Sequence, residues 1–202
     1  MGGSVIKTNF TRGSGLFENL LSKKRAALAA HYIRKHNGPQ TSILDIGCGT
    51  FPFFLSRVNF TNKYALDRIP VYTPSLNIHF TNQDLQVNVQ LPFEDNTFDV
   101  ITALAFVEHV NDANRKKLFL EIYRVLKRGG MFFLTTPCKW TESILIILAK
   151  LNMVSREELR EHKDLLTRDE LKELLILSGF DRHTIQSGRF EAGLNLYEMA
   201  VK

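Results

Sequence analysis

The hydrophobic pattern divides the chain into one helical N-terminal stretch and a series of short apolar runs. Residues 16–36 carry apolar side chains three or four positions apart, which predicts an amphipathic helix that Asn37, Gly38 and Pro39 bring to an end. The runs that follow are short enough for buried strands, and a weaker one lies among them at 77–80. The predicted strands are 42–46, 63–66, 77–80, 98–104 and 131–135.

Helical segments are predicted between these strands. Residues 114–127 show helical spacing that Gly129 and Gly130 close, and the apolar stretch 51–58 has Pro52 at a suitable first helical position. Strand and helix therefore alternate from about residue 43 to 136, which is typical of βαβ units and a mainly parallel sheet.

The rhythm changes after residue 137. Residues 141–161 are unusually apolar and have helical spacing. A further helix is predicted over 168–178, because Thr167 and Glu170 form the sequence pattern of a capping box. Residues 182–187 and 194–201 alternate like two strands joined by a glycine-containing connection, with the last strand antiparallel.

Composition places the chain among globular proteins. It has 202 residues, a net charge of +5, 44% hydrophobic and 23% charged residues, which excludes a disordered, collagenous or coiled-coil chain. Cys48 and Cys138 form neither a disulfide framework nor a metal-binding pair, so a reducing, cytoplasmic setting is expected. The apolar stretch 144–154 is too short to span a bilayer. Short, scattered basic groups indicate solvated helix faces and not a nucleic-acid interface.

The strongest chemical feature is a strand that runs into two glycines. Gly47 and Gly49 permit a tight turn and close approach of the backbone to a ligand. Asp45 precedes them at the strand end, where its carboxylate can face an amino group. Asp67 follows Gly47 by 20 residues, at the end of the next strand, where an acid can bind ribose hydroxyls. A nicotinamide-dependent oxidoreductase satisfies much of this pattern as well, although position 52 holds proline where its third glycine belongs.

Several motifs together resemble the class I S-adenosylmethionine-dependent methyltransferases of the small-molecule type. They occur in the family's order: DIGCGT at 45–50, LD at 66–67, QDL at 83–85, LPFEDNTFDVI at 91–101, EHV at 108–110, LKRGG at 126–130 and TTP at 135–137. The chain departs from the family at Phe51, where many members have a third glycine, so the shape of the loop is expected to differ locally.

The resemblance implies a doubly wound α/β fold with a mostly parallel seven-stranded sheet and an antiparallel C-terminal strand. It also implies a single domain over 1–202: an N-terminal helical cap (1–39), a cofactor-binding core (40–137), a possible helical lid (138–166) and a closing helix and β-hairpin (167–202). The lid segment is equally compatible with a core helix. Neither the motifs nor the composition indicates an oligomeric state.

The resemblance also assigns a cofactor site. The glycine-rich loop would hold the methionine part of S-adenosylmethionine, Asp67 the ribose, and Asp84 the adenine amino group beside the Leu85 backbone. The segment after the fourth strand would line the methyl-donor position. The full predicted set is Asp45, Gly47, Cys48, Gly49, Asp67, Arg68, Asp84, Leu85, Leu104 and Phe106.

The expected reaction is metal-independent in-line displacement, with a small-molecule acceptor and S-adenosylhomocysteine as product. The sequence contains no metal-binding motif, and a sulfonium is already a good leaving group. His109 is the candidate general base by position, although a histidine there more often simply caps or packs its segment. Cys138 follows the fifth strand like the nucleophile of RNA cytosine methyltransferases, but the second Pro-Cys pair of those enzymes is absent.

The acceptor half of the site is expected to come from elements around the cofactor. Candidates are the N-terminal segment 10–21, residues 108–110, the stretch after Pro137, and a hairpin tip formed by residues 189–191 with Asn195. Ordinary turn chemistry explains the hairpin tip equally well. A non-catalytic module that retains the cofactor fold is the other alternative to an enzyme.

Overall fold

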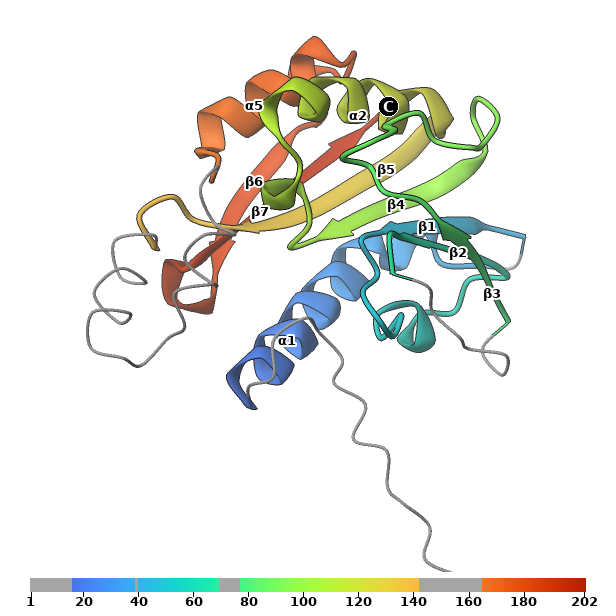
Figure 1. Cartoon of the computed structure of the whole chain (residues 1–202), viewed down its shortest axis with the longest axis horizontal. Helices are drawn as coiled ribbons and strands as arrows, with labels where there is room; N and C mark the ends of the chain where they lie inside the picture. The colour runs from blue at the N-terminus through green and yellow to red at the C-terminus, as the bar shows by residue number, and fades with distance from the viewer. Residues whose placement is uncertain (1–15, 39, 70–76, 142–164) are drawn as a thin grey trace, which may run out of the picture.

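A seven-stranded sheet in the order β3-β2-β1-β4-β5-β7-β6 forms the centre of the computed structural model, which describes residues 16–38, 40–69, 77–141 and 165–202 (Figure 1). The strands from β1 to β5 pair in parallel, and β7 pairs antiparallel with both β5 and β6. This arrangement confirms the fold class expected from the sequence. The strands are β1 Ser42–Ile46, β2 Asn62–Asp67, β3 Ile78–Asn82, β4 Phe98–Leu104, β5 Leu126–Pro137, β6 Gln186–Phe190 and β7 Asn195–Val201.

The position of β1 determines where a ligand can bind. β1 lies between β2 and β4, so the chain leaves it in one direction toward β3 and returns on its other side through β4 and β5. In open α/β sheets, the crevice at such a switch point lies beyond the carboxyl ends of the strands. At this edge Asp45 of β1 pairs with Ala65 of β2 and with Thr102 of β4.

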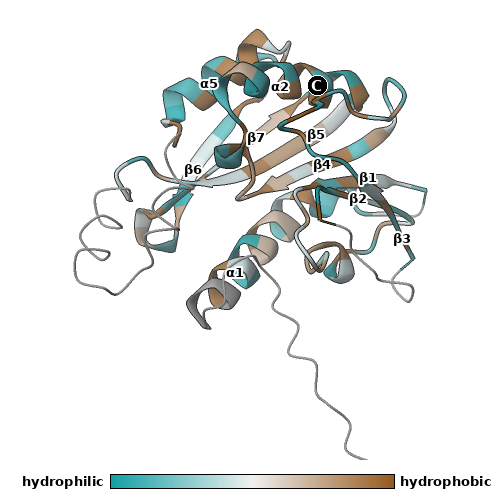
Figure 2. Cartoon of the chain, in the orientation of Figure 1, coloured by the Kyte–Doolittle hydropathy of each residue, from teal (hydrophilic) through white to brown (hydrophobic). Residues whose placement is uncertain are grey.

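Helices cover both faces of the sheet. α2 (Asp112–Val125) and α5 (Arg168–Leu177) pack on one face, and α1 (Leu16–Ile33) packs on the other (Figure 1). Figure 2 shows hydrophobic residues along β4 and β5 and hydrophilic residues on the outer turns of α5. Within the described ranges, no helix has the length and apolar character required to cross a membrane.

Alternate residues of each strand supply the two cores, as the two-residue repeat of a strand requires. Side chains from the even-numbered positions of β5 face α2 and α5, and those from the odd-numbered positions face α1. The first core includes Leu44, Ile101, Phe132, Leu134, Phe119, Ile122, Leu171 and Leu175. The second includes Ala26, Ala29, Ile33, Ile43, Val100, Met131 and Phe133.

The capping box predicted for the last helix is present. The Thr167 hydroxyl accepts a hydrogen bond from the Glu170 backbone N–H at 3.3 Å, and Glu170 Oε2 accepts one from the Thr167 backbone N–H at 2.6 Å. These two bonds satisfy N–H groups that have no partner inside the first turn of a helix.

Two predicted elements differ from the structure. Residues 51–58 do not form the expected helix and contain only a short 3-10 turn, Leu55–Arg57. Their apolar side chains are buried against α1, so the pattern reflected burial and not helical structure. The expected helix 114–127 ends at Val125, because Leu126 pairs with Phe98 and already belongs to β5.

The glycine pair lies inside β5 and does not cap the helix. Gly129 has φ +74°, and the pairing of β4 with β5 shifts register between Phe98 and Val100. The β-hairpin is also displaced, since a 3-10 turn occupies Arg182–Thr184 and the strand begins at Gln186. The apolar stretch 141–161 lies, apart from residue 141, outside the described residues.

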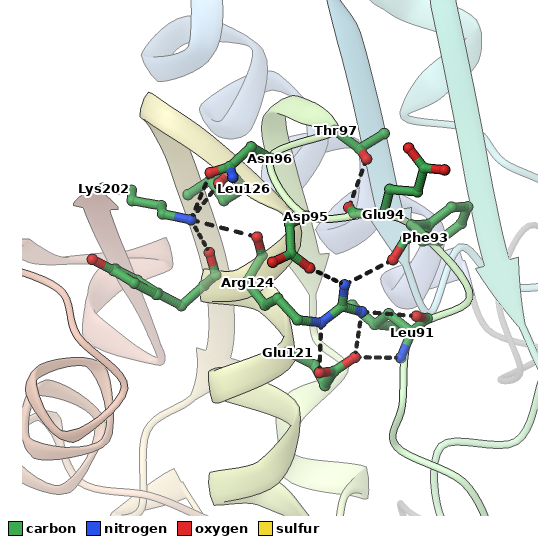
Figure 3. A network of polar contacts seen from close by, with 11 residues as sticks. Leu91, Phe93, Glu94, Asp95, Asn96, Thr97, Glu121, Arg124, Leu126 and Lys202 are labelled. Atoms are coloured by element: carbon green, nitrogen blue, oxygen red, sulfur yellow. Dashed lines mark hydrogen bonds and ion pairs between the residues drawn. The ribbon is translucent and has the colours of Figure 1, made fainter.

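A polar network lies at the amino ends of β4 and β5, at the end of the sheet opposite the switch point (Figure 3). The Arg124 guanidinium donates two hydrogen bonds to Glu121, at 2.8 and 2.7 Å, and one each to the backbone carbonyls of Leu91 and Phe93. The Lys202 ammonium donates to the Leu126 carbonyl at 2.8 Å. The network therefore fixes the loop before β4 to the end of α2.

A buried carboxyl group on β7 is expected to make stability depend on pH. Glu198 is 1% exposed and lies beneath α5, and Ser187 donates a 2.6 Å hydrogen bond to its Oε2. Burial raises the pKa of Glu198 to about 7, partly offset by the Ser187 hydrogen bond and by Arg168 and Lys172, whereas Asp169 adds to the rise.

We expect Glu198→Gln to reduce the loss of stability on going from pH 5 to pH 8 by about 1–3 kcal/mol. The unfolded chain releases the Glu198 proton near pH 4.5, whereas the folded chain retains it to about pH 7, so rising pH favours unfolding of the wild type across this interval. Urea unfolding at both pH values measures the effect. The same substitution at the exposed Glu94 is the control, and equal pH profiles for both variants would contradict the assignment.

Candidate active site

The glycine loop after β1 has the conformation that its sequence predicts. Gly47 and Gly49 have φ values of +75° and +73°, which side chains other than glycine seldom adopt. The Gly47 N–H donates a 2.8 Å hydrogen bond to the Leu66 carbonyl, so the end of β2 holds the loop. A Cβ atom at Gly47 would lie 2.1 Å from the Phe106 ring, which packs directly on this backbone.

Asp45 places a buried carboxyl group at the base of the loop. The side chain is 4% exposed, and the Thr102 hydroxyl donates a 2.7 Å hydrogen bond to its Oδ1. Burial raises the pKa of Asp45 to about 7, the Thr102 hydrogen bond opposes this shift, and the negative charge of Asp67 adds to it. Asp45 therefore changes its charge near neutral pH, at the centre of the switch point.

Asp67 orders the loop as well as facing it. Its Oδ2 accepts a 2.9 Å hydrogen bond from the Gly49 N–H, and its Oδ1 accepts one of 3.0 Å from the Ile69 N–H. The residue is 2% exposed. With these two bonds Asp67 ties the backbone of Gly49 and Ile69 to the end of β2.

The two aspartates and both glycines line a cavity of about 140 Å³. Most of the predicted cofactor residues meet there, together with His109, the candidate base. The lining residues are Ser22, Arg25, Ala26, Asp45, Gly47, Cys48, Gly49, Phe51, Phe53, Phe54, Asp67, Leu104, Ala105, Phe106 and His109. The N-terminal helix was expected to contribute through residues 10–21, and it lines this cavity through Ser22, Arg25 and Ala26. Helical spacing does not show which turn faces a ligand.

Three predicted residues lie outside this lining, among the residues the structure describes. Arg68 is exposed, Leu85 is buried in the core beside α2, and Asp84 accepts a 2.9 Å hydrogen bond from the Gln86 N–H. Asn82 bonds the carbonyls of Asp67 and Arg68, which connects the ends of β2 and β3. The assignment of Asp84 to adenine therefore stays a prediction.

The segment after β4 is strained and firmly held. Ala105 has φ +52°, which is unusual for a residue with a side chain, and its N–H donates to the Thr135 carbonyl at 2.9 Å. The His109 N–H donates to the Phe106 carbonyl at 2.9 Å, and Gln86 donates a side-chain hydrogen bond to the His109 carbonyl. These bonds fix the backbone that presents Phe106 and His109 to the cavity.

Glu108 is a second buried carboxyl group beside the cavity. It is 4% exposed, and burial raises its pKa to about 7, with opposing contributions from Arg25, Thr136 and Arg115 among others. Within the described ranges, no group of three His, Cys, Asp or Glu side chains could hold a metal ion. Sequence reasoning placed Glu108 near the acceptor but gave no sign of its burial.

Strand order and loop geometry define a Rossmann-like methyltransferase fold. Residues 44–134 match the methyltransferase domain family. A crystal structure of an S-adenosylmethionine-dependent methyltransferase from Archaeoglobus fulgidus has the same fold, with a TM-score of 0.66 at 17% identity over 93% of this chain and 98% of that one.

Curated relatives point to the same family. A sterol 24-C-methyltransferase from Schizosaccharomyces pombe is 32% identical over 117 residues, which cover 50% of this chain and 30% of the relative. A ubiquinone/menaquinone biosynthesis C-methyltransferase from Hydrogenovibrio crunogenus is 28% identical over 190 residues, 79% of this chain and 71% of the relative. These matches assign residues 44–134 to the methyltransferase domain family, and this family and the structural neighbours imply S-adenosylmethionine as the cofactor. It spans about a third of the length of the sterol methyltransferases that it matches.

We expect Gly47→Ala to destabilise the protein by about 2–4 kcal/mol, because it adds a clash with Phe106 to the cost of a left-handed backbone. Gly129→Ala is the matched control, since Gly129 has nearly the same φ, +74°, and nothing within 4 Å of an added Cβ. We expect Gly129→Ala to lower the free energy of unfolding by about 1 kcal/mol. Urea unfolding measures both, and equal losses would show that Phe106 does not press on the loop.

Proposed function

We propose that this chain binds S-adenosylmethionine beside the glycine loop and transfers its methyl group to a small-molecule acceptor. The observation that carries the proposal is the buried Asp45 carboxyl group directly below two left-handed glycines, at the switch point of a methyltransferase sheet. This arrangement offers an anion for an amino group and a backbone without side chains for close contact.

The proposed binding residues lie in the same spatial order as the parts of the donor that they would contact. Asp45 would hold the methionine amino group, the backbone of Gly47 and Gly49 would approach the chain that follows, and Asp67 would accept hydrogen bonds from the ribose. Asp84 and the Leu85 backbone, at the end of β3, would then meet the adenine. The order follows the carboxyl ends of β1, β2 and β3.

The cavity must enlarge to accept the whole donor. Its volume of about 140 Å³ is below the roughly 300–1,000 Å³ of typical ligand pockets. Phe106 is the residue that would move, because its ring covers the backbone of Gly47.

When bound, the donor supplies a methyl group on a sulfonium, which leaves readily. The chain has to align the acceptor for in-line displacement and exclude water. Phe106 and Leu104 provide apolar walls, and His109 is placed to accept a proton from the acceptor. Cys48 and Cys138 are thiols outside any disulfide, which fits a reducing compartment, so we propose a cytoplasmic location.

Asp67→Ala should weaken binding of S-adenosylhomocysteine by about 1–3 kcal/mol, through loss of charge-assisted hydrogen bonds and of the bond that holds Gly49. Asp95→Ala is the control, since Asp95 contacts Arg124 at the opposite edge of the sheet. Titration calorimetry measures the affinities. Unchanged affinity in a folded Asp67→Ala variant would remove the ribose assignment, and binding of NAD without binding of S-adenosylhomocysteine would favour an oxidoreductase.

Affinity for S-adenosylhomocysteine should fall as the pH drops below about 7. The ligand's ammonium group requires an ionised Asp45, whose pKa is about 7, so each lower pH unit costs up to about tenfold in affinity. Calorimetry from pH 5.5 to 8.5 tests this. Asp45→Asn should flatten the profile, whereas Glu108→Gln, which removes the other group with a pKa of about 7 at this edge, should not.

A further inference from the structure

Four buried polar atoms beside the cavity have no hydrogen-bond partner among the described residues. They are Arg25 Nε, Glu108 Oε2, Thr136 Oγ1 and Glu191 Oε1. Glu108 and Thr136 are 4% and 1% exposed, so their side chains are almost completely buried. An unpartnered buried polar atom is costly. Four of the five such side-chain atoms among the described residues gather here, and the fifth, Glu198 Oε1, lies beneath α5. This concentration indicates that a ligand supplies the missing partners.

These atoms come from four elements that meet at the carboxyl ends of β4 and β5. Arg25 lies on α1 and lines the cavity, Glu108 follows β4, Thr136 is near the end of β5, and Glu191 lies in the connection between β6 and β7. α1 contacts β4 and β5, and its course beneath the sheet is visible in Figure 1.

Arg25 interacts electrostatically with both glutamates of this cluster. Its positive charge lowers the pKa values of both Glu108 and Glu191, against a larger opposing effect of burial. The Thr136 side chain also lowers the pKa of Glu108 as a hydrogen-bonding neighbour, although Thr136 Oγ1 and Glu108 Oε2 have no hydrogen bond of normal geometry with a described residue. The Asn195 amide donates a 2.5 Å hydrogen bond to Glu191 Oε2, which fixes that carboxyl group and leaves its Oε1 without a partner. Both glutamates are therefore near Arg25, although neither forms an ion pair with it among the described residues.

We propose that this cluster binds a neutral, hydroxyl-bearing acceptor, an inference that rests on the proposed methyltransferase function. The unpartnered atoms include an N–H donor, two carboxyl oxygens and a hydroxyl oxygen. A hydroxyl group can donate to a carboxylate and accept from a guanidinium at once. An ammonium group has no lone pair that could accept a hydrogen bond from Arg25, and an ionised carboxylate has no proton to donate to the oxygens of Glu108 and Glu191, so neither satisfies both kinds of unpartnered atom.

In this role the cluster recognises the acceptor, and the acceptor atom that receives the methyl group is not assigned. Glu108 and Thr136 are substrate-binding residues in it, and Arg25 lies where the acceptor meets the donor cavity. The first two residues are therefore the better positions to substitute, because neither lines the cavity beside the glycine loop.

Matched fragments test the chemical preference directly. Benzyl alcohol, benzylamine, benzoate and toluene share one ring and differ in the polar group, and each is titrated by NMR against the full chain with and without S-adenosylhomocysteine. We expect benzyl alcohol to bind at least tenfold more tightly than the other three. Equal or tighter binding of benzylamine or benzoate, or no binding of any fragment, would overturn the proposal.

Three variants test which residues produce the preference for benzyl alcohol. Glu108→Gln and Thr136→Val should each reduce benzyl alcohol affinity about tenfold while leaving S-adenosylhomocysteine affinity within twofold. Glu198→Gln is the control: this carboxyl group also has a pKa of about 7, but it lies beneath α5 on the face away from α1. Two positions are used so that one remains if the other variant does not fold. A preference that persists in the folded Glu108 and Thr136 variants would contradict the assignment.

The same titrations separate this inference from the proposed function. Binding of S-adenosylhomocysteine without a preference for benzyl alcohol would refute the acceptor class alone. Absence of S-adenosylhomocysteine binding in calorimetry would refute the proposed function, whatever the fragments do.

Discussion

The placement of β1 between β2 and β4 is the constraint on which the rest of the structure depends. Because the chain leaves β1 toward both sides of the sheet, the connecting segments diverge at its carboxyl end and leave a crevice. The carboxyl group of Asp45 lies in this crevice and is held by Thr102 from the neighbouring strand. The glycine loop, the cavity and the proposed acceptor cluster are all arranged around this point.

The same constraint explains which features the sequence could predict. Buried strands and the glycine loop depend on neighbouring residues, so Asp45, Gly47, Gly49 and Asp67 could be located by pattern alone. The helix expected at 51–58 was wrong, because buried apolar residues in a short connection show the same pattern as a helix face.

Residues that act through tertiary contacts could not be predicted in this way. Arg25 reaches the cavity from a helix far away in sequence, and Thr136 gave no signal within an apolar strand. Glu191 and Asn195 were suspected at the hairpin tip, and the structure shows them hydrogen-bonded to each other. The unpartnered atoms of the cluster become visible only when all neighbours are known.

The two ends of the central strands differ in how their polar groups are satisfied. At the amino ends, Arg124 and Lys202 donate hydrogen bonds to carbonyl and carboxylate oxygens of the surrounding loops (Figure 3). At the carboxyl ends, Glu108 and Thr136 keep buried atoms without partners of normal hydrogen-bond geometry among the described residues. Groups that stabilise the fold and groups of the proposed acceptor cluster are thus separated in space: substitutions near Arg124 act on folding, whereas apolar replacements near Glu108 would exchange the proposed acceptor contacts for stability.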